Sequence, residues 1–126
     1  MRKIILTAAI FAAAIPAAQF AVAQTGVYPN KPVIISEAGW ATNSNGRGIQ
    51  PHNTSQDLQD IYVRDLLQWA DSAGILTFVF EAFDEPWKGS PDPLEPEKHW
   101  GLYTVDREPK LAMRNISASM LAGIEV

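Results

Sequence analysis

The chain has 126 residues, which is enough for one small domain with one core. Acidic residues outnumber basic residues by 14 to 10, so no nucleic acid is expected as a partner, because phosphate binding needs a basic face. Cysteine is absent, which excludes disulfides and thiolate metal sites and leaves packing as the source of stability.

The first 23 residues have the pattern of a secretory signal peptide. Arg2 and Lys3 precede an apolar stretch at residues 4–15, and Ala-Val-Ala at 21–23 suits a signal peptidase. The stretch is shorter than the roughly 20 residues of a membrane-spanning helix, so no stable membrane anchor is expected. We predict a signal peptide at 1–23 and a secreted, periplasmic or cell-envelope location. The alternative is an uncleaved helix lying against the membrane.

The exported part, residues 24–126, contains two short apolar runs that predict strands. Residues 33–36 end at Glu37, and residues 75–80 end before a second group of acidic residues. Neither run alternates with polar residues, which is typical of parallel strands buried on both faces.

Helices are predicted between and after these strands. Thr54 or Ser55 can cap a helix with one apolar face, and Gly74 stops it. Residues 109–121 are weakly amphipathic and predict a last helix. Strand, crossover helix and strand make one βαβ unit of an α/β fold.

Acidic residues follow both predicted strands. Glu37 lies at the end of the first, and Glu81, Asp84 and Glu85 follow the second. The carboxyl ends of parallel strands meet at one edge, where such folds collect catalytic groups. Two carboxylates in one cleft are what glycosidic-bond hydrolysis needs, and nearby aromatic side chains such as Trp40 can stack on sugar rings. The alternative for these residues is a solvated rim without chemistry.

Three motifs in order carry a family resemblance: KPVIISEAGW at 31–40, FEAFDEPWK at 80–88 and EKHWGLY at 97–103. They resemble the last quarter of glycoside hydrolase family 17, which comprises retaining β-1,3-glucanases and related glucan transferases. The resemblance implies a partial (β/α)₈ TIM barrel, equivalent to the last two βα units. Residues 24–126 are therefore expected to be a C-terminal fragment of such a barrel.

The resemblance also implies roles for single residues. Glu37 in Glu-x-Gly-Trp maps onto the nucleophile, and Trp40 of that motif is assigned to substrate binding. Glu85 and Lys88 of Glu-x-x-Lys, and Glu97 before Trp-Gly-Leu, are implied to support substrate binding. The family's general acid lies in an Asn-Glu pair after the fourth strand, and this sequence has no such pair.

These observations predict a retaining glycoside hydrolase that acts on β-1,3-glucan, with little activity expected from this chain alone. No metal or organic cofactor is implied, since carboxylate-driven cleavage needs none, and His52 and His99 match no ligand spacing. The expected partners are β-glucan and a complementary barrel fragment. Two alternatives stay open: a non-catalytic truncated fragment that at most binds glucan, and a signal peptide joined to a distant coding segment.

Overall fold

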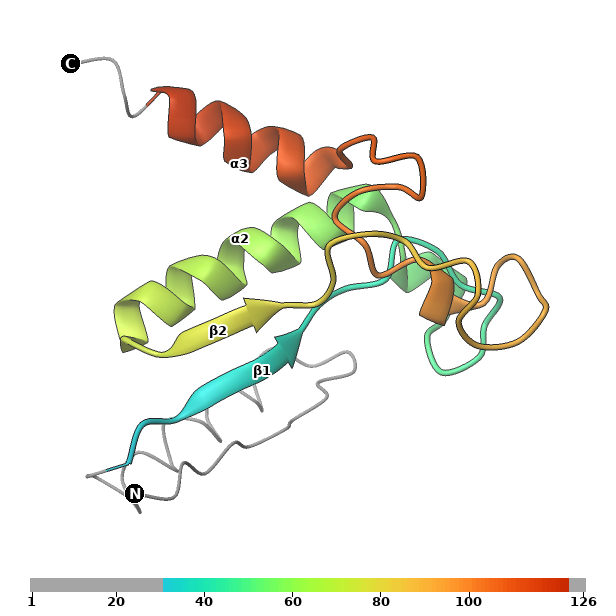
Figure 1. Ribbon diagram of the computed structural model, residues 1–126, viewed down its shortest axis with the longest axis horizontal. Coiled ribbons are helices and arrows are strands. Elements are labelled where there is room, and N and C mark those ends of the chain that lie inside the picture. The colour runs from blue at the N-terminus through green and yellow to red at the C-terminus, as the bar shows by residue number, and fades with distance from the viewer. Residues whose placement is uncertain (1–30, 123–126) are drawn as a thin grey trace.

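The structure is a computed structural model that describes residues 31–122, so the predicted signal peptide at 1–23 lies outside the described residues. Two strands, β1 (Ile34–Ala38) and β2 (Leu76–Val79), form a parallel pair. Helix α2 (Gln56–Ala73) connects them, and helix α3 (Leu111–Ala122) ends the described chain. Figure 1 shows α2 lying along the strands with α3 beside it. The predicted βαβ unit of an α/β fold is confirmed.

The register of the strand pair sets the edge at which the acidic residues lie. Ile34 pairs with Leu76, and Ala38 pairs with Val79, with an irregularity in β1 between these pairs. The Phe80 backbone N–H donates to the Ala38 carbonyl at 2.8 Å, which extends the pairing one residue beyond β2. The carboxyl ends of both strands therefore lie side by side.

The first strand is longer than predicted. The sequence placed its end before Glu37, whereas β1 continues through Glu37 to Ala38. Backbone pairing rather than side-chain polarity sets the limit, because Ala38 is still hydrogen-bonded to the chain after β2.

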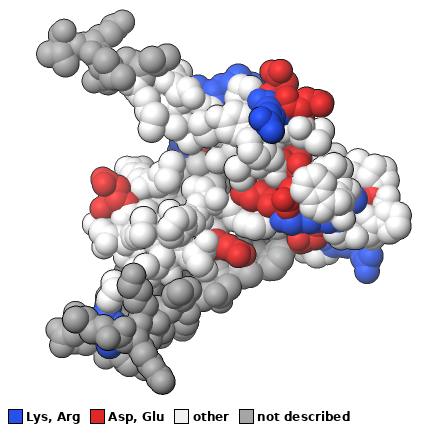
Figure 2. Space-filling view, in the orientation of Figure 1, with Lys and Arg blue, Asp and Glu red and all other residues white. Residues whose placement is uncertain are grey.

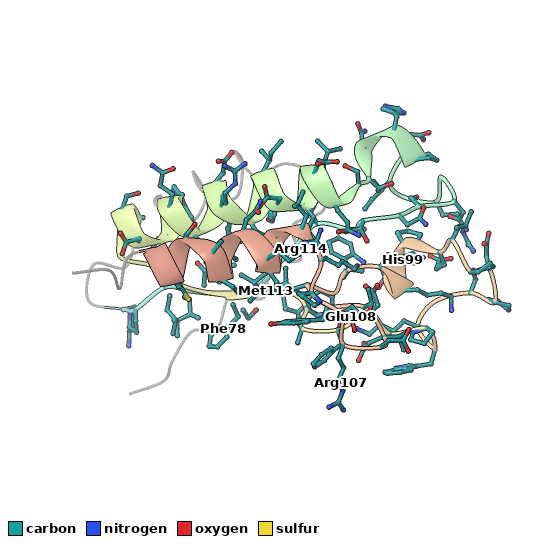
Figure 3. All side chains as sticks on the ribbon, turned by 90° about the horizontal axis from the view of Figure 1, so that it is seen from above. Phe78, His99, Arg107, Glu108, Met113 and Arg114 are labelled. Atoms are coloured by element: carbon teal, nitrogen blue, oxygen red, sulfur yellow. The ribbon has the colours of Figure 1, made fainter. Side chains whose placement is uncertain are left out.

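The prediction that both strands are buried on both faces is wrong for β2. Leu76 and Phe78 are 58% and 54% exposed, and they alternate with half-buried Thr77 and Val79. Figure 3 shows Phe78 pointing away from the helices. The core lies on the other face of the sheet, where Ile35 and Ile75 pack against α2. The continuous apolar run therefore forms a strand with one face toward the core and a second face that the described residues leave exposed.

The helix predicted to start at Thr54 or Ser55 and to stop at Gly74 is confirmed as α2. The Ser55 hydroxyl accepts a hydrogen bond from the Leu58 N–H at 3.0 Å, which satisfies one of the free donors of the first turn. Gly74 ends the helix with φ 63°, a left-handed conformation that glycine adopts without steric cost. Neither α2 nor the described part of α3 is long and apolar enough to cross a membrane.

Candidate active site

Glu37 lies on β1 with an exposed side chain, one residue before the Ala38 that pairs with β2. The chain leaving β2 passes through Phe80 to Glu81. Figure 2 shows acidic and basic side chains in contact with one another over the loops that follow the strands. The predicted nucleophile and the second acidic group thus share the carboxyl-terminal edge of the sheet.

Lys88 lies between two carboxylates in the loop after β2. Its Nζ is 2.6 Å from Oε2 of Glu81 and also contacts Oε2 of Glu85. The ammonium lies 4.6 Å from the centroid of the Phe80 ring, a cation–π contact. The structure therefore brings together two residues that the sequence assigned to binding, Glu85 and Lys88, and adds Glu81, which had no assigned role.

The pKa values of this cluster shift in opposite directions. Burial raises the pKa of Glu81, and the Lys88 ammonium offsets only part of that effect. The hydrogen bond from Lys88 lowers the pKa of Glu85. Partial burial acts to lower the pKa of Lys88, but its bonds to Glu81 and Glu85 outweigh burial and leave this pKa raised. As pH falls, Glu81 is thus expected to take up a proton before Glu85.

A buried ion pair fixes the loops on either side of this cluster. Nζ of Lys110, a residue only 3% exposed, donates to Oδ1 of Asp84 at 2.7 Å and to Oγ1 of Thr42 at 2.8 Å. Oδ1 of Asp84 also accepts from the Gly101 N–H at 3.0 Å. Burial lowers the pKa of Lys110, and Asp84 opposes this shift. The pair joins the loops after both strands to the segment before α3.

Gln59 makes a second connection from inside the molecule. Its side chain on α2 is fully buried, and Nε2 lies 2.9 Å from the Trp40 carbonyl and 3.0 Å from the Gly101 carbonyl. The Trp100 carbonyl is 3.3 Å away. Helix α2 therefore holds both the turn after Glu37 and the segment after Glu97.

Four aromatic residues near the ends of the two strands divide into two groups by exposure. Trp40 is half-buried, with its Nε1 donating to the Asn53 carbonyl at 2.8 Å and its ring 5.2 Å from that of Tyr62. Trp100 is buried in a small cluster with Ala41 and Ile49. Trp87 and Phe83 are 73% and 43% exposed. Of these four residues, Trp87 alone is more than half exposed, because the Phe83 ring lies 5.6 Å from that of Tyr103 and has Arg107 over it.

Glu97 is half-buried in a single 3₁₀ turn, Pro96–Lys98. The turn that follows Lys88 packs closely against this segment, since a Cβ added to Gly89 would lie 3.2 Å from the Cβ of Glu97. Gly89 also has φ 67°, a left-handed conformation. A larger residue is therefore disfavoured at this position both by the close contact and by the backbone conformation. Glu97 therefore lies on the segment that adjoins the Lys88 loop.

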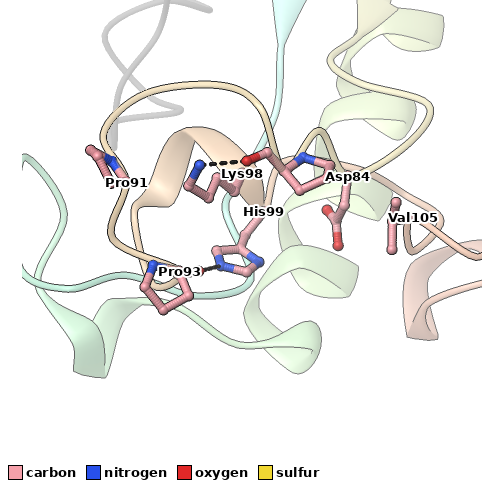
Figure 4. Close-up of a pocket in the computed structure, with 7 residues that line it drawn as sticks. Asp84, Pro91, Pro93, Lys98, His99 and Val105 are labelled. Atoms are coloured by element: carbon pink, nitrogen blue, oxygen red, sulfur yellow. Dashed lines mark hydrogen bonds between the residues drawn. The ribbon is translucent and has the colours of Figure 1, made fainter.

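A separate pocket of about 300 Å³ lies in the proline-rich loops (Figure 4). Its polar side chains are engaged with loop carbonyls: Lys98 Nζ donates to Pro86 O at 2.5 Å, and His99 Nε2 lies 2.8 Å from Pro93 O. None of the predicted site residues lines it. The lining residues are Asp84, Pro86, Pro91, Pro93, Lys98, His99 and Val105. Within residues 31–122, no group of three side chains is arranged to hold a metal ion.

Sequence reasoning missed two residues that organise the site, Gln59 and Lys110, and it noted Glu81 and Asp84 only as acidic residues after the second strand. A partial signal existed for Glu81, because Glu81 and Glu85 precede Lys88 by seven and three residues, close enough along one loop for both to reach its ammonium. Gln59 and Lys110 carried no such signal. The partners of Gln59 are 19, 41 and 42 residues away in the chain, and those of Lys110 are 11, 26 and 68 residues away.

Comparison with known proteins places this geometry among glucan-active enzymes. The chain is 38% identical over 85 residues to a glucan 1,3-beta-glucosidase of Arthroderma benhamiae, covering 62% of this chain and 26% of that relative. The endo-laminarinase of Formosa Hel1_33_131 is similar in structure, with a TM-score of 0.67 and 33% identity over 83% of this chain and 29% of the other.

A β-1,3-glucanosyltransferase of Rhizomucor miehei matches with a TM-score of 0.64 and 30% identity, over 79% of this chain and 35% of its own. An active-site mutant of that transferase, described in complex with laminaritriose, matches with a TM-score of 0.58 and 29% identity, over 75% of this chain and 35% of its own. The chain thus spans about a quarter to a third of these proteins. These structural neighbours belong to a (β/α)₈-barrel family, and residues 4–114 match the family described as glycosyl hydrolases family 17. The chain belongs to glycosyl hydrolases family 17.

Proposed function

We propose that this chain carries the nucleophile part of a retaining β-1,3-glucan hydrolase, corresponding to the last two βα units of the barrel. Glu37 is the nucleophile, and Trp40, Glu85, Lys88 and Glu97 bind the sugar. The observation that carries this proposal is the parallel pairing of β1 and β2, which puts Glu37 and the Lys88 cluster at one sheet edge.

The chemistry assigned to Glu37 needs an ionised, accessible carboxylate. In the first step, an oxygen of Glu37 bonds to the anomeric carbon while the glycosidic C–O bond breaks, and the departing oxygen takes a proton from a general acid. The sequence has no Asn-Glu pair to supply that acid. We therefore assign the acid to a complementary barrel fragment, and laminarin is the expected substrate of the combined site.

An activated sugar separates the nucleophile from the acid. The probe is 2,4-dinitrophenyl 2-deoxy-2-fluoro-β-glucoside, whose leaving group departs as a stable phenolate without being protonated. We expect one fluoroglucosyl unit to be bound covalently at Glu37, measured by intact mass and peptide mapping. Laminarin incubated with the same chain is expected to release few reducing ends.

Two variants control this labelling. Glu37→Gln removes the nucleophile and should abolish the adduct, whereas Glu108→Gln changes an exposed carboxylate away from the cluster and should keep it. An adduct on another residue would refute the role of Glu37. No adduct, either alone or after mixing with the part of the Formosa enzyme that this chain does not cover, would favour a non-catalytic fragment that only binds glucan.

We also propose that the chain is exported and that residues 1–23 are removed. The charged start, the apolar stretch and Ala-Val-Ala at 21–23 support this. The family match, however, begins at residue 4, inside this segment. N-terminal sequencing of the secreted product decides between a start at Gln24, as expected, and a retained family segment.

A further inference from the structure

Glu81 differs from the other members of the Lys88 cluster in where its backbone is held. It lies two residues after the end of β2. Its N–H donates to the Trp100 carbonyl at 3.3 Å, and its carbonyl accepts from the Leu102 N–H at 2.9 Å. The pairing continues in the next residue, since Tyr103 N–H donates to the Ala82 carbonyl at 2.9 Å. Glu81 is therefore anchored on both sides by the backbone of one neighbouring segment.

Glu85 and Lys88 lie on a turn with less support. The Lys88 N–H donates to the Glu85 carbonyl at 3.0 Å, so the two residues lie three apart on one local turn. An ion pair of this kind on a partly exposed loop contributes little by itself, because holding two long side chains costs conformational entropy. A third, anchored charge changes this, since Lys88 is then already restricted when Glu85 meets it.

The Glu81 side chain is placed to restrict Lys88 in this way. It is only 13% exposed, and its Oε2 approaches Nζ of Lys88 to 2.6 Å. The Phe80 ring lies 4.6 Å from the ammonium and reduces screening by water on that side. Nζ of Lys88 thereby has a fixed position from which it can orient the carboxylate of Glu85.

We infer that Glu81 is a positioning residue that fixes Lys88 and, through Lys88, orients Glu85 for sugar binding. The effect on sugar binding rests on the proposed function, whereas the effect on Lys88 and Glu85 does not. Glu81 itself is not expected to touch the reacting atoms. Its part is to keep the Lys88 ammonium in one place, which leaves the Glu85 carboxylate ionised and free to accept hydrogen bonds from sugar hydroxyls.

The charges that face Glu81 define how the cluster responds to pH. They are Lys88 and Glu85 on its own loop and Lys110 before α3, which is itself paired with Asp84. Burial raises the pKa of Glu81, while Lys88 lowers that of Glu85. Acidification should therefore protonate Glu81 first and free Lys88 from Glu81 while Glu85 is still ionised and paired with Lys88.

The test uses the full chain labelled with ¹³C and ¹⁵N, and it follows the Lys88 ε-methylene and the Glu85 carboxyl carbon by NMR as pH is lowered. We expect the two ε-protons of Lys88 to give separate signals in the wild type. As pH falls, these signals should merge at the midpoint of the Glu81 titration, before Glu85 takes up its proton. This measurement needs no variant. Merging at the midpoint of Glu85 instead would overturn the inference.

Substitutions give an independent test. Glu81→Gln keeps the side-chain shape without the charge. In this variant we expect the two Lys88 ε-protons to give one signal at neutral pH and Glu85 to titrate in a single step. Glu81→Asp keeps the charge and should restore part of the inequivalence, while Glu108→Gln is the control and should match the wild type. Unchanged Lys88 and Glu85 signals in a folded Glu81→Gln chain would overturn the inference.

Laminaritriose binding, measured by calorimetry, links the cluster to the proposed function. Glu81→Gln and Lys88→Met should each weaken binding about tenfold, the effect of losing one charge-assisted hydrogen bond, and the double variant should be no weaker than either. Additive losses would show that Glu81 does not act through Lys88. A wild-type chain that binds no laminaritriose would refute the glucan site, and the NMR titration would still decide the role of Glu81.

Discussion

Gln59 shows how a single buried side chain can hold a site that it does not touch. Its amide lies within hydrogen-bond distance of three carbonyls from two separate segments, one of which contains Trp40 and the other Trp100 and Gly101. Two of these bonds, those to the Trp100 and Gly101 carbonyls, are buried, so without Gln59 these two carbonyls would lose a donor that water could not replace. The turn after Glu37 is thus tied to the segment after Glu97 through α2.

Replacement of Gln59 by Met is expected to lower the free energy of unfolding by about 2 to 4 kcal/mol, because the shape is retained while buried acceptors lose their donor. Urea unfolding followed by tryptophan fluorescence measures this loss. Gln68→Met, at an exposed position of the same helix, is the matched control and should change stability by less than about 0.5 kcal/mol. Equal midpoints for the two variants would mean that these hydrogen bonds are not needed.

At the scale of elements, α2 was predictable to within two residues at each end. Ser55 and Gly74 are local signals, and local signals act before any tertiary contact forms. The helix's buried face was less predictable. Apolar Ile61 is 47% exposed, whereas Gln59 is fully buried, because carbonyls from distant segments make a polar side chain favourable there.

The residues of the candidate site also divide into those that local motifs predicted and those that depend on distant contacts. Glu85, Lys88 and Glu97 were identified from their motifs, and the structure joins the first two directly. Asp84 was noticed only as an acidic residue beside them. Its partner Lys110 comes from the segment before α3, and a pairing across 26 residues leaves no periodic pattern in the sequence.

The cap of α2 gives a prediction for this element. Ser55→Ala removes the acceptor of the Leu58 N–H and should lower the free energy of unfolding by about 1 kcal/mol. Thermal unfolding by circular dichroism measures the change. Ser117→Ala, at an exposed position within α3, should be close to neutral, and a loss of equal size there would contradict the capping role.

In the molecule as a whole, the sheet has one covered face and one exposed apolar face. The helices cover one face, while Leu76 and Phe78 on β2 expose large apolar side chains on the other. Figure 3 shows this direction for Phe78. A parallel pair of strands is normally covered on both faces, and exposed apolar strands promote association. This face is where the proposed complementary barrel fragment would pack.

Replacing both Leu76 and Phe78 by Thr therefore separates folding from association. Thr suits a strand, and both positions are more than half exposed, so the free energy of unfolding should change by less than about 1 kcal/mol. The variant should stay monomeric at higher concentration by sedimentation velocity. It should also lose any increase in Glu37 labelling that the added barrel fragment brings. Ile61→Thr, also at an exposed apolar position but on α2, controls for general hydrophobicity and should keep both properties. A double variant that still associates and still gains labelling would place the partner's docking surface elsewhere, because the face that completes a barrel cannot tolerate polar side chains at both positions.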